Sequence, residues 1–165
     1  NIPSVCRFLD VGGGKGTFVS ELKKIYPKVD AAVFDLPGSH SETSGHRCII
    51  GSFKEDELPA GYDIISLVRI LYDHRDETIR DLLGKAYGAL DKGGRLIVSE
   101  PMLGADRPTL WGDVYFAMYT LAMSTGKTRS PDQVSEFIKD AGFSNVTIHK
   151  SARPFITTVI EARKT

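Results

Sequence analysis

Cysteine is scarce in this sequence: Cys6 and Cys48 are the only two among 165 residues, and they lie far apart. Neither belongs to a Cys-x-x-Cys pair or to the Cys and His spacing of a zinc site, so we expect no metal site and no redox motif. Both stand beside apolar, strand-like runs, which predicts inert thiols. A chain of this length can bury a hydrophobic core large enough to be stable without disulfides or metals.

An excess of charge of one sign is also absent. Lys plus Arg and Asp plus Glu each number 21, so no overall field attracts nucleic acid or an anionic membrane. No apolar run approaches the roughly 20 residues that a transmembrane helix needs, and the first residues lack the pattern of a signal segment. We therefore expect a cytoplasmic domain that acts on a small molecule, with no nucleic acid partner and no membrane span.

Short apolar runs alternate with helical patterns along the chain, which is typical of βαβ units and a mostly parallel sheet. The first five expected strands are 7–11, 31–34, 47–50, 62–68 and 95–99. These runs lack polar alternation, which predicts burial on both faces. One helix follows the first run until Pro27, and another, with apolar residues from Ile79 to Leu90, is expected to end at Lys92-Gly93-Gly94.

The last third of the chain has a different pattern. Residues 109–124 are rich in aromatic side chains and Met, and Ser130-Pro131-Asp132 then opens a helix that closes at Gly142. Two strands follow, 145–149 and 155–162, with a connection too short for a parallel crossover. The prediction is an α/β sheet of seven strands, mostly parallel, with helices on both faces and a C-terminal antiparallel β-hairpin. A dinucleotide-binding sheet differs, because both its halves are parallel.

The first strand runs into a glycine-rich loop at 10–16, which reads Asp-Val-Gly-Gly-Gly-Lys-Gly. It is not a dinucleotide fingerprint, since Thr17 and Val19 stand where the third glycine would be, and it also lacks the pattern of a P-loop. Glycines let the backbone approach a ligand closely, and the helix that follows presents free N–H groups to a carboxylate such as that of a methionyl group. Asp35, 19 residues beyond Gly16, ends the second strand and can accept both hydroxyls of a ribose.

Four stretches, 9–16, 34–37, 51–53 and 93–101, together resemble one family. The sequence is similar to the class I O-methyltransferases that use S-adenosylmethionine, related to plant caffeate-type and bacterial polyketide enzymes. The stretches 71–74, 112–117 and 153–155 are similar to its bacterial carotenoid branch, which methylates hydroxylated acyclic carotenoids. The resemblance implies a Rossmann-like catalytic domain over 1–165. It also implies an N-terminal helical domain, not present here, that pairs two subunits into a homodimer and covers the substrate pocket.

The resemblance also implies which residues hold each part of the cofactor. The glycine loop would surround the methionyl group, the acid after the second strand would hold the ribose, and 51–53 would lie against the adenine. Members of the family usually have Asp where Ser52 stands, but a hydroxyl can still accept a hydrogen bond from the adenine amino group. The predicted cofactor-binding residues are Asp10, Gly12, Gly14, Gly16, Asp35, Leu36, Ser52, Phe53 and Arg69.

The acid and base residues of the plant-type enzymes are only partly retained. Their His-Asp-Trp pattern matches Tyr72-Asp73-His74, so a poor base, with a pKa of about 10, stands at the base position. His74 has a suitable pKa but, by resemblance, packs against the adenine. The first acidic partner matches Glu100, whereas the second falls at Thr128. We expect alignment of the reactants to matter most, with late proton loss to Glu100, His74 or water; the predicted catalytic residues are Glu100, His74 and Tyr72.

One helical face between 109 and 124 carries large apolar side chains. Its members recur at offsets of four, three, one and three: Trp111, Tyr115, Met118, Tyr119 and Ala122. Such a stripe either packs in the core or forms the wall of a pocket for a large apolar substrate. Its place directly after the fifth strand favours the pocket, so Trp111, Tyr115, Met118 and Tyr119 are predicted to contact substrate.

The remaining charged loop residues and histidines are expected to be solvated; they include His46, Arg107, Lys127 and Arg129. The function expected is methylation of a hydroxyl on an apolar substrate, such as a hydroxylated carotenoid. Alternatives are a transferase for phenolic or polyketide hydroxyls or for a tetrapyrrole carbon, and a module that binds the cofactor without turnover. A nicotinamide oxidoreductase is disfavoured by the glycine spacing.

Overall fold

A seven-stranded sheet with the order β3-β2-β1-β4-β5-β7-β6 is the centre of the molecule. The computed structural model describes residues 2–39, 46–104, 108–149, 151 and 156–165. The five parallel strands are Arg7–Val11 (β1), Asp30–Asp35 (β2), Arg47–Ile50 (β3), Tyr62–Val68 (β4) and Leu90–Glu100 (β5). Ser144–His149 (β6) and Thr158–Arg163 (β7) pair antiparallel, and β7 is also antiparallel to β5. The predicted sheet is confirmed.

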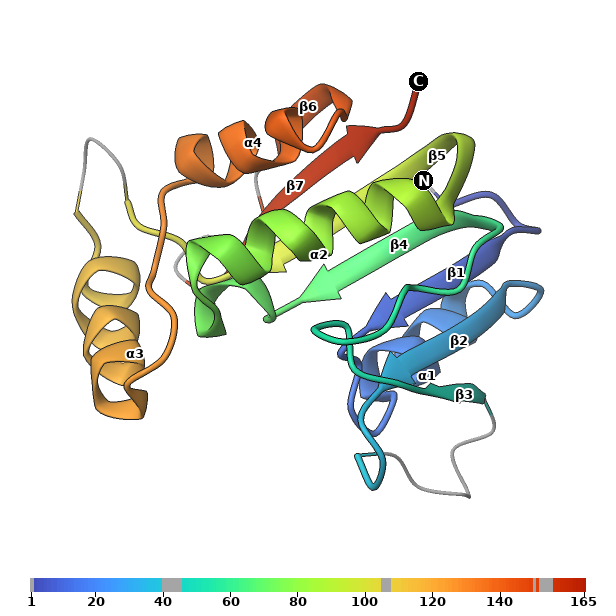
Figure 1. The fold of residues 1–165 in the computed structure, drawn as a ribbon, viewed down its shortest axis with the longest axis horizontal. Coiled ribbons are helices and arrows are strands. Elements are labelled where there is room, and N and C mark those ends of the chain that lie inside the picture. Colours follow the sequence, from blue (N-terminus) through green and yellow to red (C-terminus); the bar gives the residue numbers. More distant parts are fainter. Residues whose placement is uncertain (1, 40–45, 105–107, 150, 152–155) are drawn as a thin grey trace.

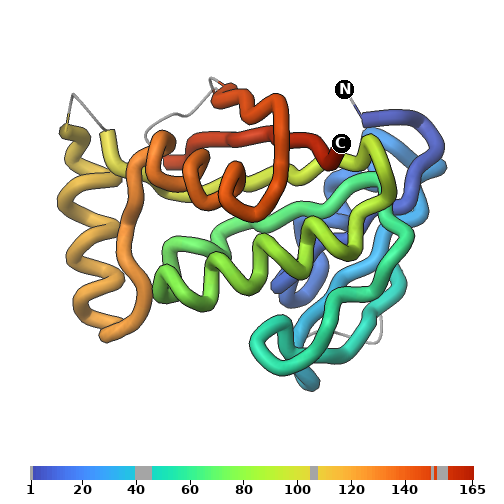
Figure 2. The backbone as a smooth tube through the Cα atoms, turned by 45° about the horizontal axis from the view of Figure 1, so that its top comes forward, coloured from blue at the N-terminus to red at the C-terminus, as the bar shows by residue number. Residues whose placement is uncertain are grey.

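Helices cover both faces of this sheet, as predicted (Figure 1). Thr17–Ile25 (α1) packs on one face, and Asp76–Ala89 (α2) and Pro131–Asp140 (α4) lie side by side on the other (Figure 2). A single 3-10 turn, Leu71–Asp73 (η1), separates β4 from α2. After β5 the chain forms a π-helical segment, Leu110–Phe116 (η2), that continues into Ala117–Met123 (α3).

Alternate residues of the central strands supply two apolar cores. Leu9 and Ile65 are fully buried on the face covered by α2 and α4, whereas Phe8 and Ile64 are buried on the face covered by α1. Because each strand changes face at every residue, a strand that is apolar throughout must be covered twice. The absence of polar alternation in these strands therefore predicted that helices cover both faces of the sheet.

The sequence signals for the start of α4 are confirmed. The Ser130 hydroxyl accepts a hydrogen bond from the N–H of Gln133 at 3.2 Å, and the Ser130 N–H donates to the Gln133 side chain at 3.0 Å. Pro131 occupies the first helical position, where its missing N–H costs nothing.

Two predicted boundaries and one predicted helix are wrong. Helix α2 ends at Ala89 and β5 begins at Leu90, so Gly93 and Gly94 lie in a bulged start of the strand rather than in a turn before it. Segment 109–124 is not one α-helix: it begins as the π-helical η2, where Gly112 lies so close to the chain after β5 that a Cβ would be 2.1 Å from the Met102 carbonyl oxygen. Strand β7 begins at Thr158, with a turn at residue 156, and residue 155 lies outside the described residues.

None of the helices within the described ranges is long and apolar enough to cross a membrane.

Candidate functional site

The glycine loop follows β1 at the carboxyl edge of the sheet. Gly12, Gly14 and Gly16 have φ values of 71°, 55° and 72°, a backbone conformation that other residues rarely adopt. The N–H of Gly12 donates to the carbonyl of Phe34 at 2.8 Å, and a Cβ on Gly12 would lie 2.3 Å from Cδ1 of Ile70. The loop therefore sits between the ends of β2 and β4 in a position that only glycine permits.

Asp35 is joined to this loop by direct hydrogen bonds. One carboxylate oxygen accepts the N–H of Gly14 at 2.7 Å, and the other accepts the N–H of Leu36 at 2.6 Å. Each oxygen retains a lone pair for a ligand hydroxyl. The structure thus brings together three of the predicted cofactor residues.

Asp10 is buried beneath the loop. Its Oδ1 accepts a 2.5 Å hydrogen bond from the hydroxyl of Ser66, while its Oδ2 finds no hydrogen-bond partner among the residues that the structure describes. A Cβ on Gly13 would lie 2.4 Å from Oδ2, so the glycine leaves room for this oxygen beneath the loop. Burial, partly offset by the Ser66 hydrogen bond and reinforced by Asp35, raises the pKa of Asp10 to about 7. A cationic group against Oδ2 would favour the ionised form.

The loop after β3 carries Ser52 and Phe53. The Asp56 carboxylate accepts the N–H of Ser52 at 2.8 Å, and the ammonium of Lys85, from α2, donates to the carbonyl of Phe53 at 2.9 Å. The Phe53 ring meets the His74 ring edge-on, with centroids 5.2 Å apart. This contact places His74 beside the residue that the sequence assigned to the adenine, and burial lowers the pKa of His74, which keeps the ring neutral at pH 7.

Glu100, at the end of β5, is turned toward the backbone of the next loop. Its Oε1 accepts the N–H groups of Ile70 and Leu71, each at 2.7 Å, and its Oε2 is buried without a hydrogen-bond partner in the described part of the chain. Burial, opposed by these backbone hydrogen bonds, raises the pKa of Glu100 to about 7. The carboxylate therefore supports the start of η1.

Tyr72 is the central residue of η1 and is also buried. Its ring lies 5.9 Å from that of Phe116 and 6.1 Å from that of Tyr119. The Arg69 guanidinium stacks over the Tyr72 ring, with its carbon 5.8 Å from the centroid, and Arg69 itself has an unusual φ of 59°. Burial raises the pKa of Tyr72 above its ordinary value, so its hydroxyl is a hydrogen-bonding group and not a base at neutral pH.

The aromatic stripe is exposed and does not pack in the core. Trp111 and Met118 are 45% and 60% exposed. The segment stands beyond the carboxyl ends of the parallel strands (Figure 1). Its outward side forms an open groove of about 590 Å³, lined by Leu110, Trp111, Val114, Tyr115, Met118, Tyr119 and Ala122. Core packing, one of the two interpretations open at the sequence level, is therefore wrong for these side chains, and contact with substrate stays a prediction.

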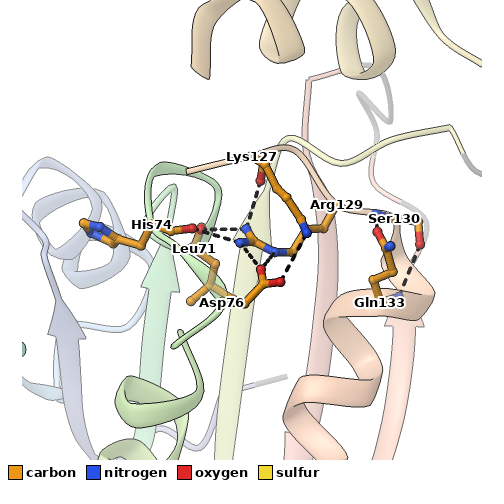
Figure 3. A network of polar contacts seen from close by, with 7 residues as sticks. All are labelled: Leu71, His74, Asp76, Lys127, Arg129, Ser130 and Gln133. Atoms are coloured by element: carbon orange, nitrogen blue, oxygen red, sulfur yellow. Dashed lines mark hydrogen bonds and ion pairs between the residues drawn. The ribbon is translucent and has the colours of Figure 1, made fainter. Parts of the chain in front are cut away.

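Two residues expected to be solvated are not. Arg129 is only 3% exposed, and all three nitrogens of its guanidinium donate hydrogen bonds (Figure 3). The ring of His46 lies so close to Gly16 that a Cβ there would be 2.0 Å from it, and both ring nitrogens are shielded. Lys127 is exposed and paired with Asp76 at 3.2 Å, and residue 107 lies outside the described residues.

A comparison with protein families matches residues 1–144 to the O-methyltransferase domain. The chain belongs to this O-methyltransferase family. Membership confirms the family that the glycine loop and the three other stretches predicted. Across the described ranges, no cluster of three or more His, Cys, Asp or Glu side chains has the arrangement of a metal site.

Similar O-methyltransferases extend the comparison. The chain is 46% identical to the demethylspheroidene O-methyltransferase of Rhodobacter capsulatus, over 96% of this chain and 41% of that protein. It is 40% identical to the enzyme of the same name from Cereibacter sphaeroides, over 98% of this chain and 45% of that protein. The chain thus spans less than half the length of these relatives.

Solved structures of O-methyltransferases have the same fold. The human N-acetylserotonin methyltransferase, in complex with S-adenosylmethionine, is 30% identical with a TM-score of 0.85, covering 98% of this chain and 48% of that one. The structure of PigF with S-adenosylhomocysteine is 30% identical in sequence and has a TM-score of 0.83. The match covers 96% of this chain and 50% of that one. The Rossmann-like class I fold is confirmed, and the cofactor predicted from the sequence is the one in the complex with the human enzyme.

Sequence reasoning missed several residues of this O-methyltransferase site. Ser66, which donates a hydrogen bond to Asp10, could have been found from the sequence, because it is a polar residue inside an otherwise apolar buried strand. Ile70, which closes over Gly12, carried no such signal, and neither did Arg129 and Asp76, which lie 53 positions apart. Contacts between loops that are distant in the sequence leave no local pattern.

Proposed function

We propose that this domain binds S-adenosylmethionine at the carboxyl edge of its sheet and transfers the methyl group to a hydroxyl of an apolar small molecule. The observation that carries the proposal is the buried Oδ2 of Asp10, which has no hydrogen-bond partner among the described residues and lies beneath a glycine loop that is bonded to Asp35. A site with a buried acid, a glycine loop and the Asp35 carboxylate suits a cationic amino acid joined to a nucleoside.

In this proposal, each part of the cofactor is held by a different group of residues. Asp10 accepts a hydrogen bond from the ammonium group, and the glycine loop holds the methionyl group, with Arg69 at its border. Asp35, with the backbone of Leu36, holds the ribose. The loop of Ser52 and Phe53, fixed by Asp56 and Lys85, holds the adenine together with His74. When bound, S-adenosylmethionine supplies a methyl group on a cationic sulfur.

Methyl transfer forms a carbon–oxygen bond as a carbon–sulfur bond breaks, and the hydroxyl proton leaves. Alignment of oxygen, carbon and sulfur is the main requirement, so proton loss can be late. The Tyr72 hydroxyl orients the acceptor beside the aromatic groove, and the proton passes to water, to His74 or to Oε2 of Glu100. The backbone hydrogen bonds of Glu100 support a positioning role for this residue more than a role as base.

The substrate class follows from the groove and from the relatives. A groove lined by seven apolar residues suits a large apolar acceptor, and two similar proteins are named demethylspheroidene O-methyltransferases. We therefore propose a hydroxylated carotenoid first. The second candidate is a phenolic hydroxyl, supported by a 28% identical relative named 3-hydroxy-5-methyl-1-naphthoate 3-O-methyltransferase.

The whole protein is proposed to be larger than this domain. We propose that an N-terminal helical domain joins two copies into a cytoplasmic homodimer and covers the exposed aromatic groove. The mass of the full-length protein, from light scattering after size exclusion, tests the dimer; a monomer at micromolar concentration contradicts it.

Binding of the cofactor is tested by calorimetric titration of the domain with S-adenosylmethionine and S-adenosylhomocysteine. Asp35→Ala should abolish measurable binding, because the variant loses both the ribose acceptor and the bond to Gly14. Asp30→Ala is the matched control, since this exposed acid lies at the other end of the same strand. Equal affinity in all three proteins contradicts the assignment.

Turnover is tested in the full-length protein with a labelled methyl donor and a panel of acceptors: a hydroxylated carotenoid, a hydroxynaphthoate and a porphyrin. Transfer to the first alone supports the proposal, whereas transfer to another identifies the alternative. Tight binding of the donor without transfer to any of them supports a binding module.

A further inference from the structure

The single turn η1 is held at both ends by a buried charge of the matching sign. At its amino end, Glu100 accepts the N–H groups of Ile70 and Leu71, each at 2.7 Å. At its carboxyl end, the Arg129 guanidinium donates to the carbonyls of Leu71 at 3.1 Å and His74 at 2.9 Å. Helix ends leave N–H and C=O groups unpaired, and they favour an anion at the start and a cation at the end.

The same guanidinium ties the flanking segments to this turn (Figure 3). Its Nε donates to the carboxylate of Asp76, in the first turn of α2, at 2.9 Å, and Nη1 donates to the carbonyl of Lys127 at 2.9 Å. Gly126 brings its own loop against η1, because a Cβ there would lie 2.1 Å from the Tyr72 carbonyl oxygen. Only the planar, five-donor fork of arginine can serve acceptors from so many segments at once.

Tyr72 lies between these two charges. Its carbonyl faces Gly126, and its ring meets Phe116 and Tyr119 at the base of the aromatic segment. The direction of the Tyr72 hydroxyl is therefore set by how η1 is held.

We propose that Arg129 is a positioning residue for methyl transfer, which together with Glu100 holds η1 so that Tyr72 meets the acceptor hydroxyl. This inference rests on the proposed function. It assigns no contact with cofactor to Arg129, whose hydrogen bonds go to η1, α2 and its own loop.

The first test is Arg129→Lys in the full-length protein, since one ammonium cannot bond all four groups. We expect kcat per bound S-adenosylmethionine to fall about tenfold to a hundredfold, as a small misalignment of reactants does. The affinity for S-adenosylmethionine should stay within about threefold, because Asp10 and Asp35 lie outside this network and His74 enters it only through its backbone carbonyl. Lys127→Met, which removes an exposed cation from the same Asp76, is the control and should keep its kcat.

A second measurement reports on η1 directly. Amide hydrogen exchange at residues 70–72 should be faster in Arg129→Lys than in wild type and in Lys127→Met, with strands β1 and β4 unchanged. Added guanidinium ion at about 20 mM, far below denaturing concentrations, should restore part of the kcat of Arg129→Ala, whereas equal sodium chloride should not.

The outcomes separate the two proposals. A wild-type protein that neither binds S-adenosylmethionine nor transfers methyl refutes the proposed function, and exchange at 70–72 then decides whether the turn is held as described. Unchanged kcat in Arg129→Lys overturns the positioning role, and unchanged exchange overturns the part given to η1. If Arg129→Lys does not fold, Asp76→Asn replaces it, because this variant loosens the guanidinium. It should lower kcat while the affinity for S-adenosylmethionine stays nearly the same. An unchanged kcat overturns the inference.

Discussion

The proposed cofactor side and the proposed acceptor side of this site are built in different ways. On the cofactor side, backbone groups do most of the positioning: three glycines with positive φ follow one strand, and the Asp35 carboxylate bonds the N–H of Gly14. On the acceptor side, side chains from distant segments do it, through Glu100, Arg129 and the rings around Tyr72. A backbone-built site tolerates little change, whereas the exposed side chains of the neighbouring aromatic groove can be exchanged while the fold is kept.

The largest effect on cofactor binding is expected from Gly12→Ala. The new Cβ meets Cδ1 of Ile70 at 2.3 Å, at a φ of 71°, so unfolding should become easier by about 1–3 kcal/mol and S-adenosylmethionine binding should be lost. Thermal unfolding and titration measure both quantities. Gly84→Ala, in the open on α2, is the control and should stabilise by about 0.5–1 kcal/mol; equal behaviour of the two variants contradicts a backbone-built site.

Two substitutions of Glu100 distinguish a role in holding η1 from a role in proton transfer. Glu100→Ala leaves two buried N–H groups unpaired, which should cost about 2–3 kcal/mol of stability. Glu100→Gln keeps an acceptor for them, so it should retain methyl transfer to within about tenfold if the carboxylate only positions η1. Rates from a labelled donor, with unfolding curves for both variants, are the measurement, and an inactive but stable Glu100→Gln assigns the proton to this residue.

Asp10 should make cofactor affinity depend on pH. Because its pKa is raised to about 7, the free domain is partly protonated at neutral pH, and a cationic ligand binds the ionised form. Affinity should fall by up to about tenfold per pH unit as the pH drops below 7, with a proton released on binding. Titrations in buffers of different ionisation enthalpy count that proton; Asp10→Asn should release none, and a pH-independent affinity in wild type refutes the role.

The pH dependence of stability has the opposite sign. In the folded domain, burial favours the protonated forms of Asp10 and Glu100, so the unfolded chain binds fewer protons than the folded one between their ordinary pKa values and about 7. These groups therefore contribute stability at low pH that is lost as the pH rises toward 7. Denaturant unfolding at pH 5 and pH 8 checks this, and Asp10→Asn should weaken the dependence.

The smallest effect on the fold is expected in the groove. Met118 is 60% exposed, so Met118→Ala should change stability by no more than about 0.5 kcal/mol, while the KM for an apolar acceptor rises about threefold to tenfold. Phe116→Ala removes a buried ring from beside Tyr72 and should destabilise by about 3 kcal/mol. An unchanged acceptor KM in Met118→Ala contradicts a substrate wall.

Sequence reasoning predicted the fold well, and it singled out the glycine loop and Asp35, which the structure brings together, for one physical reason. Strand burial, the glycine loop and Asp35 depend on residues close in sequence, which leave periodic or spaced patterns. The buried state of Arg129 could not be predicted, because its partners at 71, 74 and 76 lie 53 to 58 positions away in the sequence. The π-helical turn at Gly112 was missed likewise, since the close approach of Gly112 to the Met102 carbonyl leaves no local sequence pattern.

The π-helical turn also bears on how acceptor choice can change. Such a turn holds one residue more than an α-helical turn, so deleting a single residue within Leu110–Phe116 would restore α-helical winding. Side chains before the deletion would then rotate by about 100° relative to those after it. Trp111 would turn away from the face of Tyr119. In this segment, therefore, a change of length can alter the shape of the groove in one step, where point substitutions would need several.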